Sequence, residues 1–380
     1  MVKAVAPNTQ KNIQIQIYYP GSPTHRTGLQ LRICLDTLAE SGTQNNSKIP
    51  SVALVTGEGT DIINNPSLEN RARRKLITRK MVLALIDVAN EKGEPERTKA
   101  YWNAYHCLNN VIISDNRMFG RYCKNRFCTI CSAIRKADTI NRYYPIIAKW
   151  PDVHFVTLTV KACNEEQLNR LIYRMLRAFE LLYNRCKKRH ERGSGIKLIG
   201  VKSLECNFNP ITKTYNPHFH IIVPSREIAE LLKNEWLKQW RPIPKKTYRY
   251  KYTTPGAQHI EPVYNLESAL IETIKYGSKI FTEPDLEKKS KQKAKASPMI
   301  YARALDNILV AMKGKRIFER FGFNLPKNPT YKSNSRLVVD FETWIFPSDA
   351  ADWINPDTGE TLTGYLPPTE LSYLLNECIN

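Results

Sequence analysis

Residues 154–160 alternate between apolar and polar side chains, as a β-strand with one buried face requires. Successive side chains of a strand point to opposite faces. Val156, Leu158 and Val160 therefore share one face, and Thr157 and Thr159 share the other. The pattern predicts a strand with an apolar back and a polar front.

The same criterion predicts further strands at 196–207, 215–223 and 257–263. The segment between the first two contains Pro, Thr and Lys and is typical of a turn, so these strands are expected to form a hairpin. His218 and His220 are two residues apart and point to the same side of their strand. Two imidazoles are thereby directed at one point, although a pair of structural histidines is the simpler alternative.

Helices are predicted where apolar residues recur every three or four positions. Asn164 and Asn265 are suited to begin two of them, because an Asn side chain accepts a hydrogen bond from the first turn. The predicted helices span 69–92, 164–189, 227–240, 265–280 and 302–320. This order predicts an α+β fold, in which an antiparallel sheet of roughly four or five strands carries helices on one face and leaves the other open.

Charge narrows the class of partner. The chain has 380 residues and carries 57 Lys and Arg against 36 Asp and Glu, a net charge of +21. Such a field attracts polyanions, nucleic acid first and an anionic membrane surface second. Residues 340–380 contain eight acids and no Lys or Arg, which predicts an acidic C-terminal tail. The absence of a long apolar run and of a signal pattern at Met1 predicts a cytoplasmic protein without a membrane span.

Four of the nine cysteines fall close together in the sequence. Cys128 and Cys131 are separated by two residues, a spacing typical of zinc knuckles. Cys123 and Cys107 could complete a tetrahedral Zn²⁺ site, with His106 as the alternative to Cys107. Unliganded thiols are the alternative to a metal.

Basic residues accompany several candidate DNA contacts. Arg126 lies inside the cysteine cluster and suits a module that touches phosphates. Residues 245–252 alternate Lys and Arg with Tyr, a pattern that fits either single-strand contacts or a sheet edge. The basic run that opens helix 69–92 is read as a solvated face, with DNA contact as the alternative. The candidate DNA-binding residues are Thr157, Thr159, Arg126, Lys246 and Arg249.

Carboxylates accompany both the histidine pair and one tyrosine. Glu205 shares a face with His218 and His220 if the hairpin has the right register, and this trio could hold a divalent ion. On helix 265–280, Glu272 and Tyr276 are one turn apart and neighbours on one face. Lys275 and Lys279 flank that pair.

The order of these motifs resembles the histidine–hydrophobe–histidine (HUH) endonucleases. More narrowly, it resembles the replication initiators of rolling-circle plasmids, of the single-tyrosine type with Glu-x3-Tyr. The resemblance covers residues 101–324 and implies a ferredoxin-like palm sheet. The segments that carry it are Phe155–Thr159, Asn216–His220, Glu272–Lys279 and the upstream cysteines.

The resemblance also implies a role for each motif residue. Tyr276 would attack a phosphodiester of single-stranded or hairpin origin DNA, leaving a 5′-phosphotyrosine and a free 3′-OH. Glu272 would activate the water that ends replication, and Lys275 or Lys279 would assist the tyrosine or bind phosphate. The catalytic ion held by the histidine pair would be Mg²⁺ or Mn²⁺. Host helicase and replication machinery are the implied protein partners.

The same residues allow alternative nucleophiles and alternative protein classes. Tyr264 and Tyr301 are alternative nucleophiles, although neither has a carboxylate four residues earlier. A conjugative relaxase or a transposase is an alternative enzyme; relaxases usually present three histidines, and His259 is the downstream candidate for a third. A zinc-containing DNA-binding regulator is the alternative without catalysis. The oligomeric state is not predicted.

The motifs divide the chain into five predicted parts. These are an N-terminal region of unassigned role (1–100), a Cys-rich zinc module (101–145), an HUH endonuclease domain (146–282), a Lys-rich linker with a helical extension (283–330) and the acidic tail (331–380).

Overall fold

The computed structural model describes residues 52–56, 58–63, 65, 67–240, 253–274, 298–326 and 335–369. The helices are α1 (Ser67–Glu91), α2 (Pro95–Tyr105), α3 (Thr129–Ile147), α4 (Glu165–Glu191), α5 (Arg226–Gln239), α6 (Leu266–Thr273) and α8 (Pro298–Met312). The strands are β1 (Val52–Thr56), β2 (Thr60–Asp61), β3 (Asn110–Ser114), β4 (Arg117–Gly120), β5 (His154–Thr159), β6 (Gly200–Asn209), β7 (Thr214–Val223), β8 (His259–Pro262), β9 (Phe318–Phe321), β10 (Ser335–Val339) and β11 (Glu342–Ile345). Across these ranges, none of the helices has the length and apolar character needed to traverse a bilayer.

A five-stranded sheet, which we call the palm, has the order β8-β5-β7-β6-β9 and is antiparallel throughout. The predicted α+β class and four of these strands are confirmed. The prediction that a helix runs to residue 320 is wrong at its end. Gly314 adopts a left-handed φ of 72° beyond α8, and Phe318–Phe321 then pairs with Gly200–Ser203 as the fifth strand.

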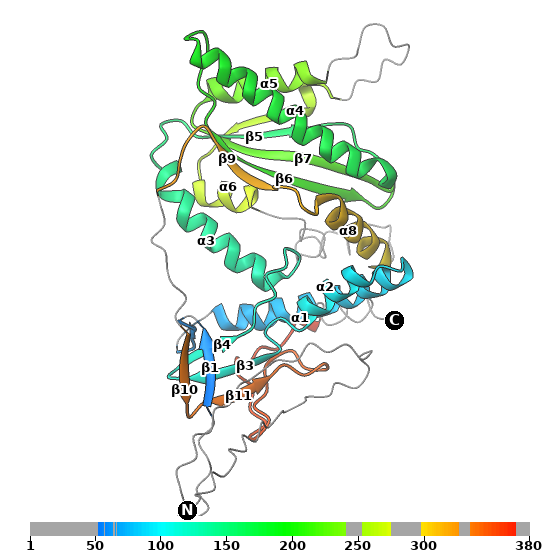
Figure 1. The fold of residues 1–380 in the computed structure, drawn as a ribbon, viewed down its shortest axis with the longest axis vertical. Helices are drawn as coiled ribbons and strands as arrows, with labels where there is room; N and C mark the ends of the chain where they lie inside the picture. Colours follow the sequence, from blue (N-terminus) through cyan, green and yellow to red (C-terminus); the bar gives the residue numbers. More distant parts are fainter. Residues whose placement is uncertain are drawn as a thin grey trace, which may run out of the picture.

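Helices lie on both faces of the palm (Figure 1). One face packs Phe219 and Ile221 against α4 and α5. The other face packs Phe155 and Ile222 against Leu270 of α6 and against the C-terminal part of α3. The expectation of helices on one face only is therefore corrected, because the face that carries the histidines also offers apolar side chains for burial.

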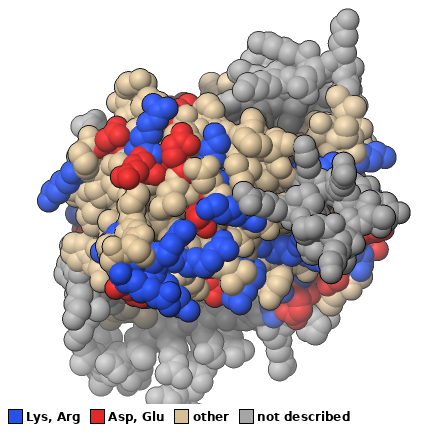
Figure 2. Space-filling model, turned by 90° about the horizontal axis from the view of Figure 1, so that it is seen from above, with Lys and Arg blue, Asp and Glu red and all other residues tan. Residues whose placement is uncertain are grey.

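On the palm face covered by α4 and α5, some of the positive charge is paired with carboxylates of the same chain. Seen from above, Lys and Arg lie among Asp and Glu on the side of α4 and α5 (Figure 2). Arg185 and Arg189 of α4 lie 3.4 and 3.1 Å from the buried carboxylate of Glu235 on α5. These cations join two helices, and the histidines lie on the opposite face of the sheet.

A second lobe contains the cysteines together with both ends of the described chain. It holds α1, α2, the sheet β11-β3-β4-β2 and the ribbon β1-β10. Residues 335–345 pair with β1 and β3, and buried Trp353 donates its indole N–H to the carbonyl of Leu108 at 2.8 Å. The described part of the predicted acidic tail is thus a structural part of this lobe, since its aromatic residues are buried there.

Helix α8 connects the lobe to the palm, so the segment predicted as an extension is built into the fold (Figure 1). Its Asp306 is fully buried and accepts hydrogen bonds from Tyr101 at 2.6 Å and from Lys92 at 2.9 Å. A buried carboxylate needs such partners because removing its charge from water is costly. The predicted Lys-rich linker before α8 lies outside the described residues.

Candidate functional site

The hairpin register brings a carboxylate beside the histidine pair. Glu205 of β6 lies opposite His218 of β7, and Thr157 of β5 lies opposite His220. All three of Glu205, His218 and His220 are buried. Their ligand atoms lie within 4.8 Å of one another, so they form one group that could hold a metal ion.

The distances within this group fit ligands around a single ion. Glu205 Oε2 lies 2.9 Å from His220 Nε2 and 3.4 Å from His218 Nε2, and the two nitrogens are 3.0 Å apart. Ligands bound at about 2.1 Å to an octahedral ion lie about 3.0 Å apart along each edge. A carboxylate that is only 1% exposed also needs a cation beside it.

The tautomer of His218 is set by the backbone. Its Nδ1 lies 2.9 Å from the carbonyl oxygen of Asn216, which can only accept, so Nδ1–H is the donor. In the neutral ring this leaves the lone pair of Nε2 directed at Glu205. That is the arrangement in which a histidine binds a metal.

Thr157 and Thr159 line the same face beside the histidines. The hydroxyl of Thr157 lies 3.5 Å from His220 Nδ1, and the hydroxyl of Thr159 donates to Asn216 Oδ1 at 3.0 Å. Their hydrogen bonds therefore support the histidine rings, and contact with DNA stays a prediction.

Helix α6, which contains Glu272 of the predicted tyrosine motif, packs on the histidine face of the palm. Asn265 caps the helix by accepting from the N–H of Ser268 at 2.9 Å, as its sequence predicted. Leu270 and Ile274 are buried against the palm, and the half-buried Glu272 lies in the last turn. The predicted site residues that lie outside the described ranges are Lys246, Arg249, Lys275, Tyr276 and Lys279.

The alternative site residues have different surroundings. Tyr264 is 94% exposed, and burial raises the pKa of Tyr301, which disfavours its phenolate. His259 is exposed and its Nε2 lies 3.1 Å from Glu261. It is not a member of the Glu205–His218–His220 group.

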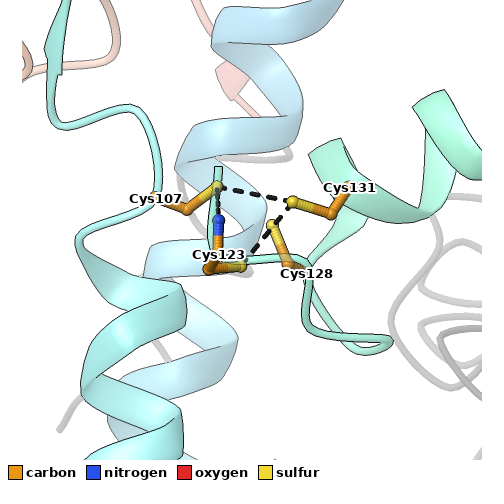
Figure 3. A group of neighbouring side chains, drawn as sticks. All are labelled: Cys107, Cys123, Cys128 and Cys131. Atoms are coloured by element: carbon orange, nitrogen blue, oxygen red, sulfur yellow. Dashed lines mark hydrogen bonds between the residues drawn. The ribbon is translucent and has the colours of Figure 1, made fainter. Parts of the chain in front are cut away.

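Four cysteines converge in the second lobe (Figure 3). Cys107 follows α2, Cys123 follows β4, and Cys128 and Cys131 lie at the start of α3. Cys107 and Cys123 place their sulfurs 3.6 and 3.7 Å from that of Cys131. Sulfurs around a tetrahedral zinc ion with bonds of about 2.3 Å lie about 3.8 Å apart. The four residues therefore fit Zn²⁺.

His106, the alternative ligand, is directed elsewhere. Its ring stacks on that of Trp102, with ring centroids 5.8 Å apart, and forms a T-shaped contact with Tyr105, with centroids 5.1 Å apart. Cys107 occupies the fourth position of the cysteine group instead. Arg126 next to the group donates to the carbonyl of Lys315 at 3.3 Å, and its exposed side chain is still a candidate for phosphate contact.

The cysteines lie beside buried positive charge. Lys75 of α1 is fully buried and donates to the carbonyl of Tyr105 at 2.6 Å. Burial, and then repulsion from Arg79, lowers the pKa of Lys75 to about 7, while Cys107 and Cys128 act in the opposite direction. Hydrogen bonds within the cluster, that with Cys107 first, hold the pKa of Cys128 well below its usual range. Zinc binds the thiolate form of cysteine, and a lowered thiol pKa favours that form at Cys128.

The interpretation of the first turns of α1 as a solvated basic face is therefore wrong for part of the run. Lys75 and Arg79 point inward, and Arg79 donates to the carbonyls of Phe346 and Pro347 in the C-terminal segment. Sequence reasoning missed these buried cations because their partners are distant in the chain, 30 positions away for Lys75 and more than 260 positions away for Arg79. The gap of two residues between Cys128 and Cys131, in contrast, was visible in the sequence.

Comparison with known proteins gives a consistent family. A family model described as a replication protein matches residues 117–334. A "Protein rep" of Staphylococcus aureus is 31% identical over 169 residues, which cover 41% of this chain and 69% of that protein. A "Protein rep" of Streptococcus pneumoniae is 27% identical over 169 residues, 41% of this chain and 50% of that protein. A "Protein rep" of a Bacillus species is 28% identical over 141 residues, 35% of this chain and 43% of that protein. No solved structure matches.

Proposed function

Because the chain belongs to the family of replication proteins, we propose that it initiates rolling-circle replication of a plasmid by nicking one strand of origin DNA. The observation that carries this proposal is the grouping of Glu205, His218 and His220 on the palm face against which α6 packs. The motif order that predicted an HUH endonuclease lies within the matched residues 117–334.

The ligand set is Glu205, His218 and His220, and its oxygen and nitrogen donors fit Mg²⁺ or Mn²⁺. When bound, the ion orients the scissile phosphate and offsets the negative charge that develops on it. In the neutral ring, the bond from Nδ1–H of His218 to the backbone carbonyl of Asn216 leaves the lone pair on Nε2. The hydroxyl of Thr157 beside His220 helps to hold that ring.

Tyr276 is proposed as the nucleophile. It follows Ile274 by two residues, a separation that a chain spans within about 7 Å. Ile274 belongs to the apolar cluster that contains Phe155, whose ring centroid lies 5.1 Å from that of His220. In the proposed step the phenolic oxygen attacks phosphorus and the 3′-oxygen leaves. The products are a 5′-phosphotyrosine and a free 3′-OH that primes synthesis.

A cleavage assay tests the proposal as a whole. The native chain, incubated with a single-stranded hairpin oligonucleotide from its origin, is expected to cleave in Mg²⁺ or Mn²⁺ and to stop when EDTA removes the ion. Electrophoresis of labelled DNA measures the nick. Binding without cleavage in both ions would favour a zinc-containing DNA-binding regulator instead.

Glu272 is proposed to activate water for the terminating hydrolysis, because a carboxylate one turn before the nucleophile can act as a general base. Glu272→Ala is expected to nick and join DNA at near-native rates but to hydrolyse the second site about 100-fold more slowly. Glu267→Ala, in the first turn of the same helix, is the control and should leave both reactions unchanged. Loss of the first nick in Glu272→Ala would contradict this division of roles.

We further propose that the cysteine group holds a structural Zn²⁺. The proposed partners are single-stranded or hairpin origin DNA and the host helicase and replication machinery. His259 lies outside the metal-binding group, which favours an initiator over a relaxase with three histidine ligands.

A further inference from the structure

At the end of β5, where pairing with β8 has stopped, a side chain forms hydrogen bonds to the strand backbone. β8 pairs with β5 as far as Thr157, whereas β7 accompanies β5 to Thr159. Beyond the last β8 pair, Gln258 Oε1 accepts from the N–H of Thr159 at 2.9 Å, and Gln258 Nε2 donates to the carbonyl of Thr159 at 3.3 Å. One amide thus supplies both hydrogen bonds that a paired strand residue would supply.

Other contacts fix this amide and the residue that it holds. Gln258 is buried, and its Nε2 also lies 2.5 Å from Thr253 Oγ1 and 3.0 Å from the carbonyl oxygen of Thr254, so its two hydrogens are shared among three acceptors. The carbonyl of Thr159 accepts further bonds from Thr253 Oγ1 at 2.9 Å and from Trp236 Nε1 at 3.2 Å. Because buried hydrogen bonds are strong and directional, Thr159 has a single defined position.

Thr159 is linked through Asn216 to a histidine of the metal-binding group. Its hydroxyl donates to Asn216 Oδ1 at 3.0 Å. The backbone carbonyl of the same Asn216 accepts from His218 Nδ1–H at 2.9 Å. Partly buried hydrogen bonds therefore connect Gln258 to the ring of His218 through the residues Thr159 and Asn216.

We propose that Gln258 is a positioning residue for the ion held by Glu205, His218 and His220. It acts through Thr159 and Asn216 to hold the ring of His218 with Nε2 directed at Glu205. Outer partners of metal-binding histidines set ring orientation, and their loss weakens metal affinity by about 10- to 100-fold. The inference rests on the proposed function, since it requires an ion at this group.

Titration of the full-length protein with Mn²⁺, followed by electron paramagnetic resonance, tests this inference. The cysteine site is first filled with Zn²⁺ so that Mn²⁺ reports on the histidine group. Gln258→Ala is expected to raise the Kd for Mn²⁺ at least about 10-fold. Thr159→Val, which removes the hydroxyl at nearly constant shape, is expected to act in the same direction. Thr159→Ser retains the hydroxyl and should keep native affinity.

Asn209→Ala is the matched control. Asn209 lies at the turn between β6 and β7, where its Oδ1 accepts from the N–H groups of Ile211 and Thr212 at 2.9 and 3.2 Å. It makes the same kind of bond in the same sheet without a connection to His218, so its Mn²⁺ affinity should stay native. Thermal midpoints of the metal-free variants show which of them are folded.

Three outcomes would overturn the inference. Native Mn²⁺ affinity in both Gln258→Ala and Thr159→Val excludes a positioning role. An equal loss in Asn209→Ala shows a general effect of a destabilised sheet. If Gln258→Ala does not fold, the Mn²⁺ affinities of the two Thr159 variants take its place. Native affinity in Thr159→Val then overturns the inference, and a loss in Thr159→Val that is absent in Thr159→Ser supports it. Failure of the native protein to bind Mn²⁺ would instead refute the metal site itself, and the inference with it.

Discussion

Tyr276→Phe is expected to abolish the covalent adduct between protein and origin DNA. The substitution removes one oxygen atom, the atom proposed to attack phosphorus, and leaves a ring of nearly the same shape. Loss of a nucleophile typically lowers the rate by a factor of about 10⁴ or more, so no adduct should be detected on the time scale of native cleavage. Denaturing electrophoresis of the protein with 3′-labelled oligonucleotide measures the adduct, because the fragment that carries the 3′ label stays bound to the tyrosine; DNA affinity should be unchanged.

Tyr264→Phe is the matched control for this experiment. Tyr264 is 94% exposed just ahead of α6, so the same oxygen is removed from a nearby tyrosine without loss of buried contacts. Its adduct should form at the native rate. A normal adduct in Tyr276→Phe that peptide mapping places on Tyr264 or Tyr301 would contradict the assignment and leave the metal-binding group as the part to be explained.

Cys131→Ser is expected to remove bound zinc and to lower the thermal midpoint strongly. Cys131 is 6% exposed and its sulfur lies within 3.7 Å of those of Cys107 and Cys123, so a serine breaks a closed four-ligand site. A loss of about 4 kcal/mol, at about 2 to 4 °C for each kcal/mol, lowers the midpoint by about 10 °C. Metal analysis and scanning calorimetry measure the two effects.

Cys163→Ser provides the comparison. Cys163 is 7% exposed and lies outside the cysteine group, so the same atomic change occurs at nearly the same burial without a metal ligand. It should keep one zinc ion per chain and lose far less stability. Equal losses in the two variants, with zinc retained in both, would show that the cysteines are ordinary buried thiols.

Packing contacts link the stability of the second lobe to the histidine face of the palm. α1 packs against both α2 and α3, and the C-terminal part of α3 packs on the histidine face of the palm. The core of the lobe is continuous with that of the palm. Loss of zinc is therefore expected to disturb the support of the histidine face from a distance, through packed side chains.

Local pattern in the sequence predicted much of the palm. The two-residue period in β5 and β7 indicated which side chains share a face, because that relation depends only on backbone geometry. It placed His218 and His220 on one face, and Glu205 beside them on condition of the hairpin register that the structure shows. The gap of two residues between Cys128 and Cys131 predicted a shared metal ion on similarly local grounds, since this is a common ligand spacing in zinc sites.

Only the tertiary structure decided relations between distant segments. Strands β10 and β11 pair with β1 and β3 across more than 200 residues, and Arg79 bonds to carbonyls of the C-terminal segment. Burial of α6 on the histidine face and the contact of Gln258 with Thr159 were equally hidden. The sequence by itself determined the faces of single elements and the chemistry that each presents. Which faces meet depends on the apolar area and the hydrogen bonds that the whole chain buries. A local sequence pattern does not contain this information, because it depends on all segments together.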